Sequence, residues 1–250
     1  MLKDQIVFVT GASSGIGAAC AEVFAAQGAR ILMAARRMEY LQKLAKRLPT
    51  ESHCFQLDVT KSAQVEQALH SLPAEWQAID ILLNNAGLSR GLDKLYEGKR
   101  QDWEEMIDTN IKGLLYVTRA VVPDMLSRGR GHIINIGSTA GHEVYPGGNV
   151  YCATKHAVKA LTQGLKMDLL GTPLRVSSID PGLVETEFSM VRFHGDVERA
   201  KAVYAGLQPL TPWDVAEVVL FCATRPSHVN INDVILMPVA QASAMLVSRR

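Results

Sequence analysis

The stretch "TGASSGIG", Thr10–Gly17, decides the fold of this 250-residue chain. A five-residue apolar run, Ile6–Thr10, leads directly into it, and an alanine-rich stretch with a helical pattern, Ser14–Gln27, starts within it. A glycine-rich turn between a buried strand and a helix is typical of a dinucleotide-binding site, because the free N–H groups of the helix N-terminus bind phosphate. A Walker A loop is excluded, since no Gly-Lys-Ser/Thr follows the turn.

The three glycines of this turn have the spacing G-x-x-x-G-x-G, and each has its own physical purpose. Gly11 permits the tight turn after the strand. Gly15 leaves room for the pyrophosphate, and Gly17 lets the helix approach the strand closely. We therefore expect all three to belong to the coenzyme site.

The alternation of strand and helix continues along the whole chain. Short apolar runs predict seven strands: Ile6–Thr10, Arg30–Ala35, His53–Val59, Ile81–Asn85, His132–Gly137, Arg175–Ile179 and Asp233–Val239. Helical patterns lie between them: Ser14–Gln27, Leu41–Leu48, Ala63–Leu72, Trp103–Leu126, Val150–Leu170 and Trp213–Ala223. This order predicts an α/β fold of the Rossmann type, with a doubly wound seven-stranded parallel sheet and helices on both faces.

No linker or repeat interrupts the pattern, so we expect residues 1–250 to form a single dinucleotide-binding catalytic domain. One stretch, about residues 185–208, lies between a strand and a helix without an obvious strand of its own. Long connections in compact domains are often functional, and we expect this one to be a substrate lid. The alternative is a helical insertion that only packs against the domain.

Composition and charge exclude several classes of protein. The formal net charge is +1, with no dense basic run, so a nucleic-acid partner is not expected. No apolar stretch is long enough for a signal sequence or a membrane span. The four cysteines are scattered and form no metal-like cluster with histidine, so we expect free thiols, no metal and a cytoplasmic location.

The end of the second predicted strand indicates which coenzyme binds. NAD-dependent proteins of this fold place a carboxylate there for the ribose 2′-hydroxyl. In this chain Arg36 and Arg37 follow Ala35, and two cations suit the 2′-phosphate of NADP instead. The alternative is that both arginines are simply solvated at the start of a helix.

A tyrosine and a lysine four positions apart, in "YCATK" (Tyr151–Lys155), lie in a predicted helix. At this spacing both side chains share one helix face, and the cation lowers the pKa of the phenol towards the range needed for acid/base catalysis. Ser138 follows the fifth strand, at the sheet edge where ligands bind, and its hydroxyl can hold a substrate oxygen. Each residue alone is unremarkable in its structural context, so only their combination points to catalysis.

These motifs together resemble one family. "TGASSGIG", "NNAG" (Asn84–Gly87), Asn110, Ser138, "YCATK" and "PGLVET" (Pro181–Thr186) occur in the order typical of the short-chain dehydrogenases/reductases, over essentially the whole chain. Narrower blocks, including "SLPAEW" (Ser71–Trp76), "VRFHGD" (Val191–Asp196) and "MPVAQ" (Met237–Gln241), are similar to the branch of NADP-dependent 3-hydroxy acid dehydrogenases, which also act on serine and allo-threonine.

The resemblance implies roles for individual residues. Asn110, Ser138, Tyr151 and Lys155 would be the catalytic set, with Lys155 also binding the nicotinamide ribose and Asn110 anchoring a proton-relaying water. Further coenzyme contacts carry over to Ser13, Ser14, Ile16, Asp58, Val59, Asn85, Ala86, Gly87, Pro181, Gly182, Val184 and Thr186. Thr10 is expected to support the turn instead of contacting the coenzyme.

The substrate site is the least defined part of the sequence. Arg192, in the predicted lid, has a planar guanidinium that suits a carboxylate or sulfonate, although a salt-bridge role is the alternative. Tyr145 and Asn149, between Ser138 and Tyr151, are expected to line the pocket with Ser138 and Tyr151 themselves. Arg90 is a second candidate for binding an anion, and His142 is expected to be an exposed loop residue.

The expected activity is reversible oxidation of a small 3-hydroxy acid, such as serine, allo-threonine or 3-hydroxypropionate, to the 3-oxo acid with NADP. Reduction of another short carbonyl compound, such as a sulfonate aldehyde, is the alternative. A non-catalytic NADPH-binding sensor is a third possibility from a different class. The apolar C-terminal region, "NDVILMPVAQASAMLVSRR", resembles a subunit contact of related proteins, so a homotetramer is expected, although the sequence alone leaves dimer and tetramer open.

Overall fold

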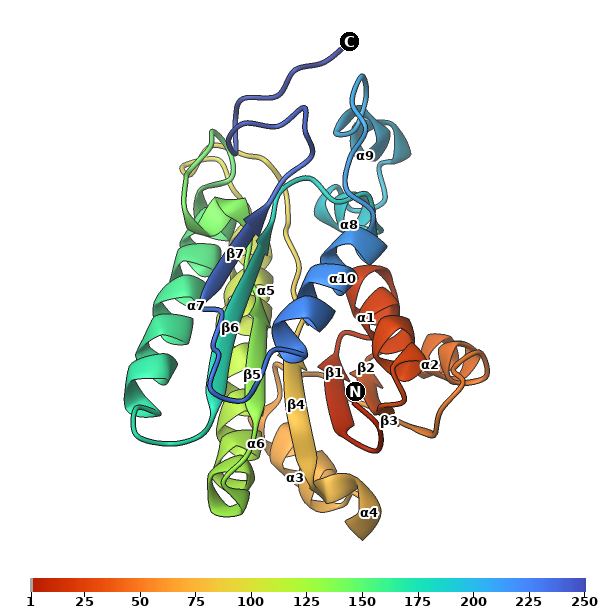
Figure 1. Ribbon diagram of the computed structural model, residues 1–250. Helices are drawn as coiled ribbons and strands as arrows, with labels where there is room; N and C mark the ends of the chain where they lie inside the picture. Colours follow the sequence, from red (N-terminus) through yellow and green to blue (C-terminus); the bar gives the residue numbers. More distant parts are fainter. Residues whose placement is uncertain (1) are drawn as a thin grey trace.

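The computed structural model describes residues 2–250 and has a single seven-stranded parallel sheet at its centre (Figure 1). Its strands are β1 (Ile6–Thr10), β2 (Arg30–Ala35), β3 (Ser52–Gln56), β4 (Ile79–Asn84), β5 (His132–Ile136), β6 (Arg175–Pro181) and β7 (Asp233–Leu236). Their order across the sheet is β3-β2-β1-β4-β5-β6-β7. The predicted fold class is confirmed.

β1 is the centre of this topology because it pairs with β2 on one side and β4 on the other. Val7 lies opposite Ile31 of β2 and opposite Ile81 of β4. The chain winds outward from β1 in both directions, so the connections leave the sheet on opposite faces at this point. Ligands of doubly wound sheets bind at such a switch point, outside the carboxyl ends of the strands.

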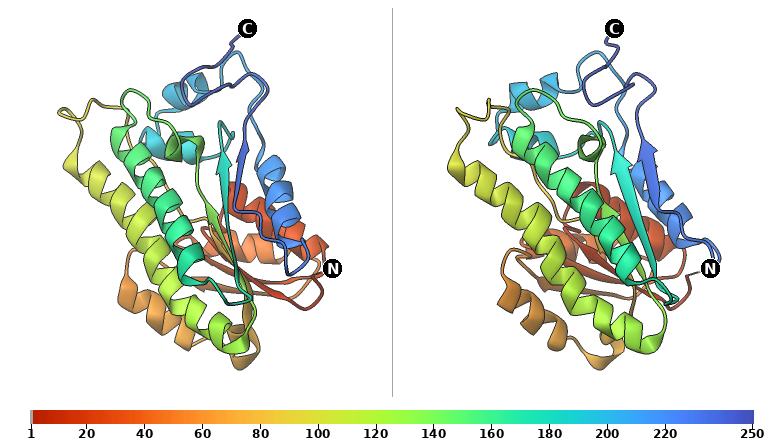
Figure 2. Two further views of the ribbon diagram at one scale, coloured as in Figure 1. Left: turned by 60° about the vertical axis from the view of Figure 1, so that its left-hand side comes forward. Right: turned by 90° about the vertical axis from the view of Figure 1, so that its left-hand side faces the viewer.

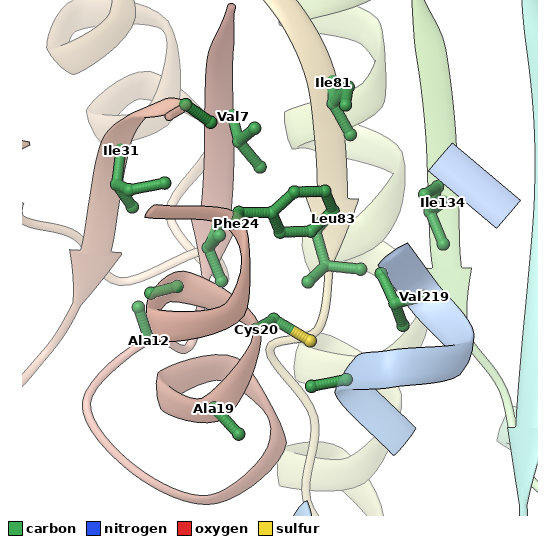
Figure 3. Packing of buried hydrophobic residues seen from close by; sticks show 14 of the residues in the cluster. Val7, Ala12, Ala19, Cys20, Phe24, Ile31, Ile81, Leu83, Ile134 and Val219 are labelled. Carbon is green, nitrogen blue, oxygen red and sulfur yellow. The ribbon is translucent and has the colours of Figure 1, made fainter. Parts of the chain in front are cut away.

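Alternate residues of each strand face two separate apolar cores. Val7 and Val9 of β1 face the helices α1 (Gly15–Ala26), α2 (Met38–Ala45) and α10 (Pro212–Ala223). Figure 3 shows this layer, in which Cys20 and Phe24 of α1 lie among strand residues and near Val219 of α10. Ile6 and Phe8 face the other layer, formed by α3 (Ser62–His70), α6 (Leu114–Arg128) and the end of α7 (Asn149–Asp168). Both faces of the sheet are therefore covered, as the continuous apolar runs predict.

The remaining helices are short, apart from α5. They are α4 (Ala74–Gln77), α5 (Arg100–Ile107), the 3₁₀ turn η2 (Thr139–Gly141), α8 (Phe188–Arg192) and α9 (Val197–Ala202). The predicted helix Trp103–Leu126 is divided: a π-helical segment, η1 (Asp108–Gly113), joins α5 to α6. This segment contains Asn110, and π turns within helices are frequent at functional sites.

Segments 185–208 and 237–250 cover the carboxyl ends of the strands. In Figure 1, α8 and α9 lie beyond the tip of β6, and both views of Figure 2 place the C-terminal tail beside them. Arg249 donates hydrogen bonds to the carbonyls of Val203 and Ala205, which ties the tail to the stretch after α9. None of the helices in residues 2–250 combines the length and apolar character that a membrane span requires.

Candidate active site

A cleft of about 830 Å³ opens at the carboxyl ends of the strands. The predicted coenzyme residues that line it are Gly11, Ser13, Ser14, Gly15, Ile16, Arg36, Arg37, Asp58, Val59, Asn85, Ala86, Gly87, Tyr151, Lys155, Pro181, Gly182, Val184 and Thr186. Ser138, Tyr145 and Arg192 line the same cleft. The structure thus brings residues from almost every part of the chain to one site.

The glycine turn has the backbone that its residues suggest. Gly11 and Gly15 have φ of 66° and 56°, a left-handed conformation that favours glycine. Gly17 lies behind the cleft, where a Cβ atom would be 2.5 Å from Asn85 Nδ2 and 2.6 Å from the Gly11 carbonyl oxygen. Two of the glycines therefore shape the turn, and the third permits the approach of α1 to the loop after β4.

Thr10 supports this turn from below. Its hydroxyl accepts hydrogen bonds from the backbone N–H groups of Asn85 and Ala86, each at 3.1 Å, and donates to the carbonyl of Leu83. The Asn85 side chain returns a hydrogen bond to the carbonyl of Thr10 at 3.0 Å. The ends of β1 and β4 are thereby joined, which fixes the floor of the cleft at the switch point.

Arg37 stands at the rim of the cleft, where the sequence predicts a phosphate contact. Its guanidinium donates to the hydroxyl groups of Ser14 (2.9 Å) and Ser13 (3.3 Å) and forms an ion pair with Glu187 at 2.8 Å. Arg36 is exposed beside it. Glu187 is a cleft residue that sequence reasoning missed, because its partner lies 150 positions earlier in the chain.

The four predicted catalytic residues converge from three elements. Tyr151 and Lys155 lie on α7 and are buried, and the Lys155 ammonium lies 5.9 Å from the centre of the Tyr151 ring. Ser138 precedes η2, and its hydroxyl accepts a hydrogen bond from the Ala140 backbone N–H at 3.1 Å. The same hydroxyl donates to the Pro181 carbonyl at 3.4 Å, and both Ser138 and Tyr151 line the cleft.

Asn110 lies behind the cleft and does not line it. Its amide donates to the Leu88 carbonyl (2.8 Å) and the Thr154 hydroxyl (3.0 Å), and its oxygen accepts from the Leu88 N–H (2.9 Å). Gly87 stands between this amide and Lys155: a Cβ atom there would be 3.3 Å from Asn110 Oδ1 and 3.8 Å from Lys155 Nζ. The absence of a side chain at position 87 lets the two catalytic candidates approach each other.

Burial dominates the ionisation of the central pair. It raises the pKa of the Tyr151 phenol, and the neighbouring Tyr145 adds to this, whereas Arg192 and the hydroxyl of Ser138 lower it. Burial also lowers the pKa of Lys155 to about 8, although the negative charge of Asp180 opposes the shift. The phenol is therefore protonated, with the cations Lys155 and Arg192 close to its ring. The sequence predicted that a nearby cation would lower this pKa, but burial outweighs that effect and the net shift is upward.

Arg192 reaches Tyr151 from α8. Its guanidinium carbon lies 5.2 Å from the centre of the Tyr151 ring and 5.5 Å from that of Phe188. It donates to Ser89 Oγ at 2.9 Å and to the Tyr145 hydroxyl. Neither partner is a carboxylate, so the charge of Arg192 faces the cleft without an acidic partner among these contacts. Ser89 and Phe188 carried no signal in the sequence.

Three other residues considered for the substrate site in the sequence do not line the main cleft. Asn149 is outside the main cleft, where its amide contacts the Asp93 carbonyl and its oxygen accepts from the Val150 N–H. Arg90 is held by Glu105 at 2.7 Å and by the Val191 carbonyl, so it fastens α8 to α5 and is not free to bind an anion. The expectation of an exposed His142 was wrong: its side chain is only 19% exposed.

Within residues 2–250, no three His, Cys, Asp or Glu side chains gather in a way that would bind a metal ion. The cysteines at positions 20, 54, 152 and 222 are free thiols.

Comparisons with known proteins agree with this geometry. The family model described as short chain dehydrogenase matches residues 5–196. The chain is 51% identical over 243 residues to the NADP-dependent 3-hydroxy acid dehydrogenase YdfG of Escherichia coli K12, covering 97% of this chain and 98% of that protein. It is 42% identical over 254 residues to the NADP-dependent 3-hydroxy acid dehydrogenase of Schizosaccharomyces pombe, covering 100% and 98%.

Solved structures of serine dehydrogenases are also similar to this chain. The closed form of a serine dehydrogenase complexed with NADP+ superposes with a TM-score of 0.94, at 51% identity, over 98% of this chain and all of that one. Serine dehydrogenase from Escherichia coli superposes with a TM-score of 0.84, at 47% identity, over 95% of this chain and all of that one.

Proposed function

Because the chain belongs to the short-chain dehydrogenase family, we propose that it is an NADP-dependent oxidoreductase that interconverts a small 3-hydroxy acid and its 3-oxo acid. Serine, allo-threonine and 3-hydroxypropionate represent the substrate class. The observation that carries the proposal is the position of Arg192, whose guanidinium lies 5.2 Å from the Tyr151 ring and has no carboxylate among its contacts. A substrate carboxylate bound there would hold its hydroxyl-bearing carbon near Ser138 and Tyr151.

The cleft fits an NADP molecule. The turn at Gly11 and Gly15 and the N-terminus of α1 offer N–H groups to the pyrophosphate. Arg36 and Arg37 would bind the 2′-phosphate, and Lys155 the nicotinamide ribose. The remaining contacts are those carried over from the resemblance, among them Asp58, Val59, Pro181, Gly182, Val184 and Thr186. When bound, the nicotinamide supplies or accepts the hydride.

The chain's own residues would handle the oxygen and its proton. Ser138 holds the substrate oxygen by a hydrogen bond as charge develops on it. Tyr151 donates a proton to that oxygen in reduction and removes it in oxidation. Lys155 stabilises the phenolate, and Asn110, behind Gly87, keeps the neighbourhood of Lys155 ordered and anchors the relaying water.

A substrate panel tests the proposal directly. With NADP, the protein should oxidise serine, allo-threonine and 3-hydroxypropionate, measured as NADPH absorbance. Turnover of a sulfonate aldehyde with NADPH, and none of the hydroxy acids, would favour the alternative substrate, since a guanidinium also binds sulfonate. NADPH binding without turnover of any member of the panel would contradict an enzyme and favour the sensor.

Arg37 should determine the coenzyme preference. Replacing it with alanine removes charge-assisted hydrogen bonds to the 2′-phosphate, so the KM for NADPH should rise about 10-fold, while the value for NADH stays nearly unchanged. Wild-type kcat/KM should favour NADPH over NADH. Arg47→Ala is the matched control, because Arg47 pairs with Glu22 outside the cleft. A KM for NADPH that Arg37→Ala leaves unchanged would remove this residue from the phosphate site.

Three broader features belong to the same proposal. Residues 185–208 would act as the substrate lid, supported by the contacts that Arg192 and Glu187 make with the cleft. The exposed apolar side chains Ile235, Val239, Met245 and Leu246 support a homotetramer, which light scattering on the purified protein would test. Free thiols in all four cysteines are consistent with the cytoplasmic location proposed from the sequence.

A further inference from the structure

A buried carboxylate lies beneath the site and has no part in the mechanism above. Asp180, the residue before Pro181, is 1% exposed at the end of β6. Its Oδ1 accepts a hydrogen bond from the Ser178 hydroxyl at 2.6 Å, and its Oδ2 contacts His142 Nε2 at 2.6 Å. A Cβ atom on Gly137 would overlap Oδ1, so the glycine before Ser138 makes room for this charge. A buried charge of this kind requires cationic neighbours.

His142 is not one of these cations, as its own partners show. Lys159 Nζ lies 2.9 Å from His142 Nδ1. An ammonium group only donates hydrogen bonds, so Nδ1 accepts and the imidazole proton resides on Nε2, which donates to Asp180. The neutral imidazole therefore orients the carboxylate, and the positive charges that balance it come from Lys159, beyond the ring, and from Lys155.

Lys155 is the buried cation one helical turn from Tyr151 on α7. Its ammonium donates to the Ile136 carbonyl, a neutral group, at 2.9 Å. The Asp180 carboxylate lies against Gly137, the residue that follows Ile136, so the two charges meet at the end of β5. Burial lowers the pKa of Lys155 to about 8, and the negative charge of Asp180 opposes this shift. The other titratable or charged groups around the pair are Tyr151 and Lys159 on α7, His142 after η2, and Tyr145 and Arg192 around the phenol.

We propose that Asp180 is a positioning residue for the reaction: its buried negative charge, oriented by Ser178 and His142, keeps Lys155 in the ammonium form beside Tyr151. The inference rests on the proposed function, because it concerns the protonation of the same catalytic pair. Asp180 touches neither substrate nor coenzyme in this role and acts only through Lys155.

The direction in which the pH profile moves when Asp180 is replaced follows from the loss of its negative charge. Carbonyl reduction requires Tyr151 with its proton and Lys155 as ammonium, so the rate falls at alkaline pH when the pair loses its first proton. Replacing Asp180 with asparagine removes a negative charge and makes that loss easier, whichever of the two groups gives up the proton. The alkaline limb of the profile should therefore move to lower pH, by about one unit, the size of shift that a neighbouring opposite charge produces.

The experiment compares pH profiles of kcat/KM for reduction with NADPH in three proteins. Asp180→Asn should move the alkaline limb to lower pH. The control Ser178→Ala removes a hydrogen bond to the carboxylate but keeps its charge, so its limb should stay at the wild-type position. A purely structural role for Asp180 would lower the rate equally at every pH, and an unmoved limb in Asp180→Asn would overturn the proposal.

A second variant covers the case in which Asp180→Asn does not fold, as judged by its thermal melting. Lys159→Gln removes the outer cation at a partly exposed position, so its limb should move to higher pH, opposite in sign. An unmoved limb, or one displaced to lower pH, would then overturn the proposal. Wild-type protein without turnover of any carbonyl substrate would instead contradict the proposed function, which keeps the two failures distinct.

Discussion

Replacing Tyr151 with phenylalanine should lower kcat about 1000-fold in both directions, with little change in the affinity for NADPH. The substitution removes only the phenolic hydroxyl, so the ring keeps its contacts with Phe188 and Arg192. A positioned acid/base group contributes roughly 10²–10⁴ to the rate, and a phenylalanine ring has no proton to donate in its place. Steady-state kinetics and a fluorescence titration with NADPH measure the two effects.

A matched control for this variant is Tyr96→Phe. Tyr96 is 78% exposed and lies outside the cleft, so its phenol should be dispensable. If Tyr151→Phe retained wild-type kcat with every carbonyl compound tested, the assignment of the acid/base residue would be wrong, together with the mechanism built on it.

Replacing Arg192 with alanine should raise the KM for 3-hydroxy acids about 100-fold. Losing a bidentate, charge-assisted contact with a carboxylate weakens binding by about this factor, and alanine offers no replacement contact. Arg192→Lys keeps the charge without the planar fork and should give an intermediate KM. The KM for a small neutral aldehyde should change little, since such a substrate has no carboxylate to lose.

Arg192→Ala should also change the pH dependence of alcohol oxidation. Arg192 lowers the pKa of Tyr151, so its removal raises that pKa. Alcohol oxidation requires the phenolate, and its acid limb should therefore move to higher pH in Arg192→Ala. An unchanged KM for acidic substrates, together with an unmoved acid limb, would place Arg192 outside the substrate pocket and reduce its role to contacts with Ser89 and Tyr145.

Sequence patterns predicted the strands well because most of them, β1, β2, β4, β5 and β6, are runs of residues buried on both faces, whereas the edge strands β3 and β7 are more exposed. They were less reliable for the helix around Asn110, where one continuous helix was expected. The π segment Asp108–Gly113 leaves the apolar spacing on either side intact, so periodicity does not reveal it. Close packing also constrains this segment: a Cβ on Gly113 would be 2.7 Å from Val59 Cγ2, an atom of the loop after β3.

The glycine turn and the Tyr151–Lys155 pair were accessible from the sequence because local spacing determines them. Three glycines between a strand and a helix constrain the backbone directly, and four positions on a helix place two side chains on one face. Neither inference requires knowing where the rest of the chain lies. The same holds for Arg36 and Arg37, which follow the second strand immediately.

Only the tertiary structure decided which distant residues surround Tyr151, Lys155 and the rest of the cleft. Arg192 reaches Ser89 across 103 positions, Glu187 meets Arg37 across 150, and His142 meets Asp180 across 38. Such contacts depend on strand order and on how segment 185–208 returns over the sheet, and no local pattern encodes them. Burial decides the ionisation of Tyr151 and Lys155 for the same reason: desolvation is a property of the packed surroundings and not of the residue or its neighbours in sequence.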